Sequence, residues 1–524
     1  MGVYLNPGNE NFKMALNSKI YVDKSLLISY TNSVLKTEQR YICVSRPRRF
    51  GKSMAANMLT AYYCRHTDSN PLFQNLAIAN HPSYRDHLNQ YNVIFLNMQH
   101  FLSRTRDIEK MQCLIEKSIL RDLLKTYPNI DYLDPNDLVG SLLDIYSETS
   151  DSFIFVIDEW DCIFREYKTD DHSQKLYLDF IRHLLKDQSY VALAYITGIL
   201  PIKKYGSHSA LNMFDEFSMA NPRFLADFTG FTESEVKTLC HTHHMDFEKI
   251  RYWYDGYCFE NSVHIYNPRS VISAMLTNSY DSFWNKTETF EALRDYIILN
   301  FDGLKDAIIE LLSGSRKKIN TNTFSNDMTT FHSSDDVLTL LIHLGYLGYD
   351  LFSKEVFIPN SEISSEFCNA IETTGWTSVI HSIKKSFLLL TAVWNKDCHT
   401  VAEYVDEMHM ETSILTYNNE NALACALALA FYSAREYYLS FRELPIGKGF
   451  ADIVYIPRKE YADKPAMITE LKWNQSVQGA ISQIKEKQYV KSLENYSGKI
   501  LLIGINYDLK TKKHQCIIEE YLRP

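Results

Sequence analysis

The stretch Tyr41-Ile42-Cys43-Val44-Ser45, followed by Arg46-Pro47-Arg48-Arg49-Phe50-Gly51-Lys52-Ser53, decides the fold of the N-terminal part of the chain. The apolar run predicts a buried strand, and the residues after it predict a tight turn that ends in Gly-Lys-Ser and opens a helix. Such a turn binds phosphate through backbone N–H groups, the helix N-terminus and the lysine, while the serine hydroxyl can ligate Mg²⁺. The residues expected to bind a nucleotide are Arg48, Arg49, Phe50, Gly51, Lys52 and Ser53.

The loop departs from the usual phosphate-binding pattern at one position. That pattern has a glycine five residues before Gly51, and Arg46 stands there. The backbone must therefore turn differently, and the fixed φ of Pro47 helps it to do so. Taken alone, the loop is also compatible with a basic surface turn before a helix.

A second apolar run supplies the other half of a nucleotide site. Phe153–Ile157 leads directly into Asp158 and Glu159, which is the Walker B arrangement. The strand end holds Asp158 where it can orient Mg²⁺, and Glu159 is placed to polarise a hydrolytic water. The alternative is a strand that ends in a solvated acidic turn, but this run follows a Gly-Lys-Ser loop in an α/β pattern, which favours the catalytic reading.

A third strand, Val191–Ile196, ends in Thr197 and Gly198. The Thr197 side chain can position the water or contact the γ-phosphate, and it is therefore a candidate nucleotide-binding residue. A simple strand-terminating turn explains the same residues equally well.

Composition limits the class of protein. The 524 residues predict roughly three domains, and the net charge of −10 argues against a generally basic nucleic-acid coat without excluding a local basic groove. The ten cysteines contain no CxxC pair, so neither a disulfide framework nor structural zinc is expected. No signal segment and no membrane span is expected either, and a reducing cytoplasm fits best.

The pattern of apolar runs changes twice along the chain. Residues 1–230 alternate short apolar runs with helical stretches, which predicts a parallel sheet covered by helices; its strands are Tyr41–Ser45, Val93–Asn97, Phe153–Ile157 and Val191–Ile196. Helical patterns dominate residues 231–390 and predict a lid and connector. Residues 391–524 predict a separate α/β domain with strands near Phe450–Ile456, Ala466–Leu471 and Lys499–Ile505.

Acidic and basic residues gather in the C-terminal part. Asp452 begins one predicted strand, and Glu470 and Lys472 stand two apart on another, so that they face the same side. Two carboxylates beside a lysine can hold Mg²⁺, align a water and stabilise a pentacovalent phosphate. Asp452 and Glu470 are the candidate metal ligands, with Lys472 as a further catalytic residue. The bare pattern is also that of a solvated sheet face.

Five motifs in this order resemble one prokaryotic family. They are Tyr21-Val22-Asp23-Lys24-Ser25, SRPRRFGKS, IDEWD, ITGILP and Trp253-Tyr254-Asp255-Gly256-Tyr257. The chain is similar over nearly its whole length to the AAA-ATPase-like proteins that carry a C-terminal PD-(D/E)XK nuclease-like domain. The resemblance implies a P-loop NTPase of the ASCE type, a helical lid, and a restriction-endonuclease-like α/β domain. It also implies that Arg46 is the usual residue of this loop, and that Glu420 is the helix glutamate of the nuclease fold. Phe450 departs from the family, which often has Arg there.

The leading hypothesis is therefore an ATP-hydrolysing protein whose nucleotide state governs a Mg²⁺- or Mn²⁺-dependent nuclease. Its expected partners are nucleic acid, in the first place DNA, and further copies of the chain. The alternative is an ATP-dependent switch whose nuclease-like domain binds nucleic acid or a protein without cutting. Cys240-His241-Thr242-His243-His244 is expected to be a packed or solvated turn, because adjacent histidines do not easily share one ion.

Overall fold

We describe a computed structural model of the chain. It covers residues 2–205, 208–209, 211–259, 263–284, 296–297, 301–373, 377–411, 427–446, 449–487, 489, 496 and 498–522. The chain divides into two compact units. Unit 1 comprises Met1–Thr287 and Lys318–Ser365, and unit 2 comprises Glu288–Lys317 and Glu366–Pro524. The three-part division at residues 230 and 390 stays a prediction.

A five-stranded parallel sheet forms the centre of unit 1. Its order is β2 (Asn92–Asn97), β3 (Phe153–Asp158), β4 (Val191–Gly198), β1 (Tyr41–Ser45) and β7 (Asp215–Phe217). The sheet confirms the α/β prediction and the four predicted strands. Every residue of β1, β3 and β4 is buried, as expected of strands covered on both faces. The edge strand β7 was not predicted, because it has only three residues and begins with two acids.

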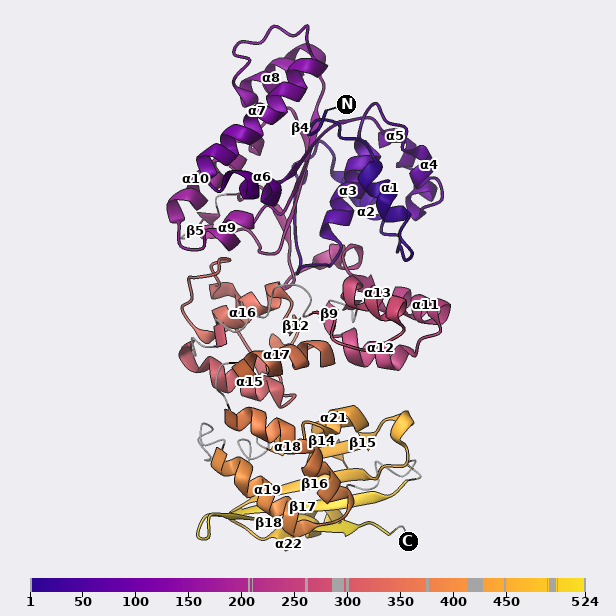
Figure 1. Cartoon of the computed structure of the whole chain (residues 1–524), viewed down its shortest axis with the longest axis vertical. Helices are drawn as coiled ribbons and strands as arrows, with labels where there is room; N and C mark the ends of the chain where they lie inside the picture. Colours follow the sequence, from indigo (N-terminus) through magenta and orange to yellow (C-terminus); the bar gives the residue numbers. More distant parts are fainter. Residues whose placement is uncertain are drawn as a thin grey trace. The chain divides into compact units, whose positions relative to one another are not determined.

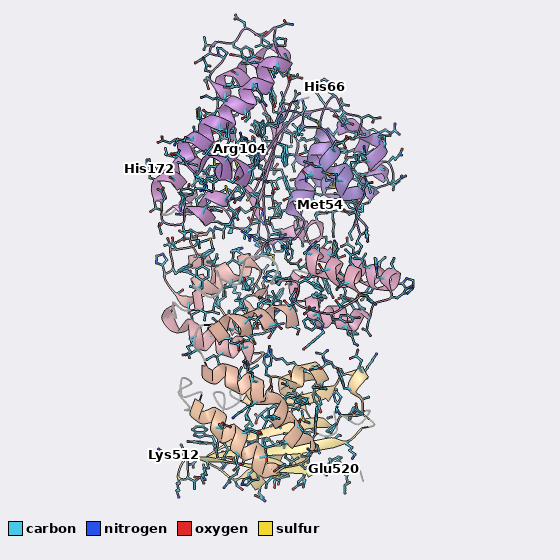
Figure 2. All side chains as sticks on the ribbon, in the orientation of Figure 1. Met54, His66, Arg104, His172, Lys512 and Glu520 are labelled. Carbon is cyan, nitrogen blue, oxygen red and sulfur yellow. The ribbon has the colours of Figure 1, made fainter. Side chains whose placement is uncertain are left out.

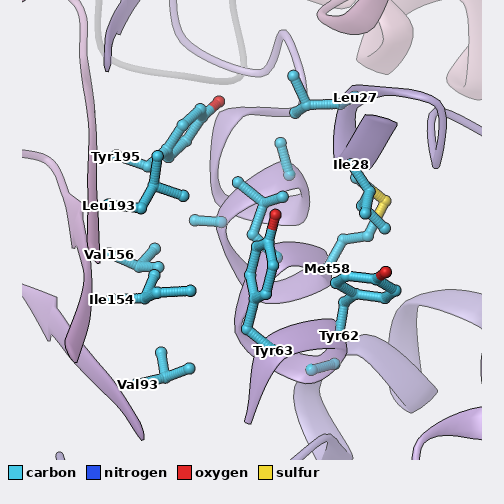
Figure 3. Close-up of a cluster of buried hydrophobic side chains, with 14 of the residues drawn as sticks. Leu27, Ile28, Met58, Tyr62, Tyr63, Val93, Ile154, Val156, Leu193 and Tyr195 are labelled. Carbon is cyan, nitrogen blue, oxygen red and sulfur yellow. The ribbon is translucent and has the colours of Figure 1, made fainter. Parts of the chain in front are cut away.

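Helices cover both faces of this sheet (Figure 1). One face carries α1 (Glu10–Leu16), α2 (Leu27–Val34), α3 (Lys52–Tyr63), α4 (Asn70–Phe73) and α5 (Tyr84–His87), and the other carries α6 (Met98–Thr105), α7 (Ile108–Thr126), α8 (Leu138–Thr149), α9 (Cys162–Glu166) and α10 (Asp171–Leu185). Figure 3 shows the core between α3 and the sheet, where Tyr63 faces Ile154, Val156 and Leu193. This packing fixes the first turn of α3 at the carboxyl ends of the strands.

The remainder of unit 1 is mostly helical, as predicted. It contains α11 (Glu233–His243), α12 (Phe247–Tyr254), α13 (Pro268–Thr277) and α16 (Ser334–Leu344), with short strands β8 (Phe231–Thr232), β9 (Tyr257–Phe259), β10 (Val263–Tyr266), β12 (Gly348–Asp350) and β13 (Glu355–Phe357). Thr232 and Glu235 form a capping box that starts α11. The His-rich stretch is the last turn of α11, with His244 in a left-handed conformation after it.

Unit 2 contains a mixed sheet in the order β14 (Tyr438–Ile446), β15 (Gly449–Pro457), β16 (Ala466–Trp473), β17 (Ile500–Asp508) and β18 (Lys513–Glu520). Only β16 and β17 are parallel. The described helices are α15 (Leu304–Leu312), α18 (Thr377–Trp394), α19 (Cys398–Glu411), α21 (Ala434–Tyr437) and α22 (Val477–Glu486), while α17 (Ser361–Thr373) extends across both units. Separate apolar clusters fill the two faces of the sheet.

Strands β15, β16 and β17 confirm the three predicted in this region, whereas both edge strands were missed. Among the helices that the structure describes, not one has the length and apolarity that a membrane crossing needs.

Candidate functional site

The loop before α3 is open where a phosphate would lie. Gly51 adopts φ 87°, and a Cβ atom built on it would have no neighbour within 4 Å. Arg49 also has a positive φ, of 68°. These conformations turn the backbone so that α3 begins at Lys52, directly after the loop. Met54, labelled in Figure 2, is 40% exposed on the same first turn, so the helix start is not covered by protein there.

Lys52 lies inside this loop. Its side chain is 4% exposed, and its Nζ donates to the Pro47 carbonyl at 2.9 Å. Burial lowers the pKa of Lys52, against the opposing effect of the carboxylates of Glu159, Asp161 and Asp158. The ammonium group is therefore close to three acids and has one replaceable carbonyl partner. It is placed to exchange that partner for a phosphate oxygen.

The strand ends bring the predicted Mg²⁺ ligands together. The register aligns Asn97, Asp158 and Thr197 across β2, β3 and β4, and Thr197 pairs with Val44 of β1. Burial raises the pKa of Asp158, while a hydrogen bond with Ser53 favours its carboxylate. Ser53 and Asp158 thus meet although they are distant in sequence.

A hydroxyl and a buried carboxylate are the oxygen ligands that Mg²⁺ takes beside phosphate and water. The residues fit the ion.

Glu159 stands at the turn directly after β3, with φ 55°. Its Oε2 is paired with the Arg165 guanidinium, and Arg165 also lies 3.3 Å from Asp161 through Nε. Thr197 is fully buried, and its hydroxyl has no hydrogen-bond partner among the described residues. Both predicted residues therefore lie at the carboxyl edge of the sheet, next to Asp158.

Arg46 explains how the loop dispenses with its missing glycine. Its side chain is fully buried and donates from Nη1 to the carbonyls of Ser45 and Phe217, at 2.9 and 2.8 Å. Burial lowers its pKa to about 10. The guanidinium links the ends of β1 and β7 through these hydrogen bonds and so stabilises the turn that follows β1.

The other residues of the loop divide into inward and outward side chains. Phe50 is fully buried, and its ring meets that of Tyr257 edge-on at 5.3 Å, so that only its backbone faces the phosphate space. Arg48 is half-buried and Arg49 exposed. The predicted nucleotide contacts at these two positions stay predictions.

Two motifs without an assigned role connect parts of unit 1. Asp23 accepts hydrogen bonds from the backbone N–H groups of Ser25 and Ala77, at 2.8 and 2.7 Å. Lys24 donates to both oxygens of Glu235, at 2.7 and 2.6 Å, and so ties the N-terminal segment to α11. In the second motif, Tyr257 donates to the Gly345 carbonyl.

A second polar site lies on the sheet of unit 2. Ile453 pairs with Thr469 in the antiparallel ladder, so Asp452 and Glu470 face each other on the same side of the sheet. Lys472 donates to Glu470 Oε1 at 3.1 Å, and Asp452 Oδ2 accepts from the Leu471 N–H at 2.7 Å. The three predicted residues are therefore together.

Only one oxygen of the Glu470 carboxyl group has hydrogen-bond partners among the described residues. Glu470 is 1% exposed, Gln483 donates to Oε1, and Oε2 has no partner among the described residues. Burial, and then the charge of Asp452, raise the pKa of Glu470 to about 7. A cation would offset both effects. Two carboxylates with a vacant buried oxygen suit Mg²⁺, which often takes one or two carboxylates and completes its shell with water and phosphate. The residues fit a metal ion.

Some residues near this site differ from expectation or cannot be placed. Lys485, one of the lysines that could contribute to a local basic groove, pairs with Glu519 at 2.6 Å, so that its charge is partly offset there. Glu420 lies outside the described residues, and the side chain of Phe450 is likewise not described.

Sequence reasoning missed two residues of the nucleotide site, Asp161 and Arg165. The second aspartate of the Ile157-Asp158-Glu159-Trp160-Asp161 motif was a signal for Asp161. Arg165 had no sequence signal other than its spacing from Glu159, because the two residues come together only through the turn of α9.

Comparison with known families identifies two parts of the chain. Residues 8–207 match the family model described as Predicted AAA-ATPase, and residues 418–517 match that of the PD-(D/E)XK nuclease superfamily. No curated protein matches the chain. The two sheets agree with these assignments. The chain thus joins an N-terminal domain of the AAA-ATPase-like family to a C-terminal domain of the PD-(D/E)XK nuclease superfamily.

Proposed function

We propose that this protein binds and hydrolyses ATP and uses its nucleotide state to control a metal-dependent nuclease. The observation that carries the proposal is the meeting of Lys52, Ser53, Asp158 and Glu159 around an open glycine loop. Arg48, Arg49 and the backbone of Phe50 complete the phosphate contacts in this proposal, and Thr197 contacts the γ-phosphate or the water.

In the proposed ATP reaction, Lys52 leaves the Pro47 carbonyl and neutralises phosphate charge. Ser53 and Asp158 would hold Mg²⁺, which when bound offsets the charge of the phosphate oxygens. Glu159 accepts a hydrogen bond from the attacking water and orients it towards the γ-phosphorus. The buried walls around Lys52 strengthen these interactions, because charges act more strongly away from water.

In the proposed nuclease reaction, Asp452 and Glu470 would hold Mg²⁺ or Mn²⁺, which when bound lowers the pKa of a water molecule. Lys472 contacts the scissile phosphate and stabilises the additional negative charge of its pentacovalent state. Gln483 keeps Glu470 oriented through its hydrogen bond to Oε1.

Control of the nuclease by ATP is supported by contacts of the loop with the helical part of unit 1. The Phe50 ring contacts Tyr257, and a Cβ atom built on Gly345 would lie 2.8 Å from the Pro47 side chain. A loop that moves to accept a triphosphate therefore displaces residues of that part. DNA as substrate, self-association and a cytoplasmic location belong to the proposal as predictions from the sequence, and a role in prokaryotic defence belongs to it as an expectation by analogy with the family.

The test measures ATP hydrolysis and cleavage of labelled single- and double-stranded DNA and RNA with Mg²⁺ or Mn²⁺. We expect K52A and E159Q to lose hydrolysis, the latter by roughly 10²–10⁴-fold, and K472A to lose cleavage. Lys485, whose side chain is 52% exposed, supplies the matched lysine control K485A. Hydrolysis unchanged in K52A, or cleavage unchanged in K472A, would contradict the proposal.

A non-cutting switch is the second candidate. It is favoured by one observation: Lys472 and Lys485, two lysines of the nuclease-like domain, are each paired with a carboxylate. Retained binding of nucleic acid without cleavage under every nucleotide and metal condition would support this candidate.

A further inference from the structure

The acid after Walker B and an arginine of the next helix form a buried network beside Glu159. The Arg165 side chain is 10% exposed and pairs with Glu159 Oε2 through Nη2. It also forms an ion pair with Asp161, whose Oδ2 lies 3.3 Å from Nε without hydrogen-bond geometry. Burial opposes the charge of Arg165, but the carboxylates of Asp161 and Glu159 raise its pKa. The guanidinium therefore stays charged and bridges two acids, which a planar fork does well and a single amine does not.

Asp161 anchors this bridge to the end of β4. It is fully buried, and its Oδ2 accepts hydrogen bonds from the backbone N–H groups of Ile199 and Leu200 at 3.0 and 2.8 Å. A Cβ atom added to Gly198 would lie 2.6 Å from Asp161 Oδ1, so the strand end and this carboxylate are in close contact. The network thus joins the residues directly after Thr197 to the carboxylate of Glu159.

We propose that Arg165 and Asp161 are positioning residues for ATP hydrolysis, and that they hold Glu159 in the orientation it needs to act on water. The inference rests on the proposed hydrolysis of ATP by Glu159. Arg165 takes Oε2, whereas no hydrogen bond to Oε1 is found among the described residues, so this second oxygen is available to a water molecule. Because Asp161 is fixed by two backbone N–H groups, its charge holds the guanidinium in place beside Glu159.

The test compares steady-state ATP hydrolysis by full-length R165A, R165K and D161N with wild type. We expect R165A to lower kcat by roughly 10- to 100-fold and to leave the KM for ATP within about twofold, since the phosphate contacts remain. R165K should recover part of the lost rate. D161N keeps an acceptor for Ile199 and Leu200 but loses the ion pair, and should fall between R165A and wild type. R182A is the matched control, because the Arg182 side chain is 53% exposed and its ion pair with Asp179, at 3.9 Å, is the only one found for it among the described residues.

A double variant separates positioning from a merely structural effect. If Arg165 acts through Glu159, then R165A adds little to E159Q, and the double variant hydrolyses ATP at about the rate of E159Q alone. Independent, multiplicative losses would overturn the inference. So would an R165A kcat within twofold of wild type, or above it, while E159Q is inactive. If R165A does not fold, R165K and D161N decide by the same criteria. No loss in E159Q would instead refute the proposed function itself.

Discussion

The hydroxyl of Tyr257 is a single polar atom that holds two segments of unit 1 together. It donates to the Gly345 carbonyl, and Gly345 in turn lies against Pro47 of the phosphate loop. Replacing Tyr257 by Phe keeps the ring on Phe50 and leaves a buried carbonyl without its donor. We expect Y257F to lower the free energy of unfolding of unit 1 by about 1–3 kcal/mol. Urea unfolding measures this change.

Tyr266 supplies the control for that measurement. Like Tyr257 it is at most 1% exposed, but its hydroxyl has no hydrogen-bond partner among the described residues. Y266F removes a buried hydroxyl that makes no such bond, and should therefore be neutral or slightly stabilising. Equal losses in the two variants would show that the Tyr257 bond contributes nothing of its own.

Glu470 links metal binding to stability. Burial and the nearby Asp452 both disfavour its charged form, and a bound cation would remove that disadvantage in the folded state only. We expect Mg²⁺ at about 100 times its dissociation constant to stabilise unit 2 by about 2.7 kcal/mol. E470Q should lose most of this gain. E519Q, which alters an exposed carboxylate of β18, should keep it. Thermal unfolding with Mg²⁺ and with EDTA provides the measurement, and equal stabilisation of E470Q would contradict Glu470 as a ligand.

At the scale of elements, the sequence predicted the strands that have an uninterrupted apolar run, including the edge strand β2, and missed the edge strands that are short or of mixed polarity. Both ends of β1 were predicted correctly, because a short, uninterrupted apolar run between polar residues is typical of a buried strand. β18 has the sequence Lys513-His514-Gln515-Cys516-Ile517-Ile518-Glu519-Glu520, and an edge strand of mixed polarity has no such pattern. The pairs Ser53 with Asp158 and Asp452 with Glu470 followed from strand order. The Arg165 bridge did not, because it depends on a helix turn that no motif specifies.

The packing of α22 against the sheet of unit 2 depends on Gly504. A Cβ atom there would lie 3.0 Å from the Val477 carbonyl and 3.1 Å from Ala480 Cβ, both on the helix. G504A should therefore lift α22, which carries Gln483, and cost about 1–3 kcal/mol of stability together with some of the Mg²⁺-induced gain.

Gly479 gives a matched control on the same helix, because the nearest atom to an added Cβ there is 3.8 Å away. G479A should stabilise by about 0.4–1 kcal/mol. Chemical unfolding of both variants decides the point, and a G504A variant as stable as wild type would show that α22 adjusts freely.

At the scale of the molecule, the polypeptide passes between the two units three times, after Thr287, Lys317 and Ser365. Residues 318–365 belong to unit 1 and contact its ATPase part: Asp327 lies 3.5 Å from Lys203, and Asn326 donates to the Ile202 carbonyl at 2.7 Å. If ATP binding changes this segment, as proposed, the change would reach the chain at two of the three passages. This connectivity gives a physical route for the proposed control of the nuclease.

The corresponding prediction is a change in cleavage rate with nucleotide state. Coupling free energies between sites are typically about 1–3 kcal/mol, so a non-hydrolysable ATP analogue should change cleavage by about 5- to 150-fold relative to nucleotide-free protein. K52A should cleave at the nucleotide-free rate whether or not the analogue is present, because Lys52 is the proposed phosphate contact. D452N should lose cleavage and still hydrolyse ATP, which separates the two sites. If wild type cleaves at one rate in all nucleotide states while both activities are intact, the control is absent, and the chain carries two independent enzymes.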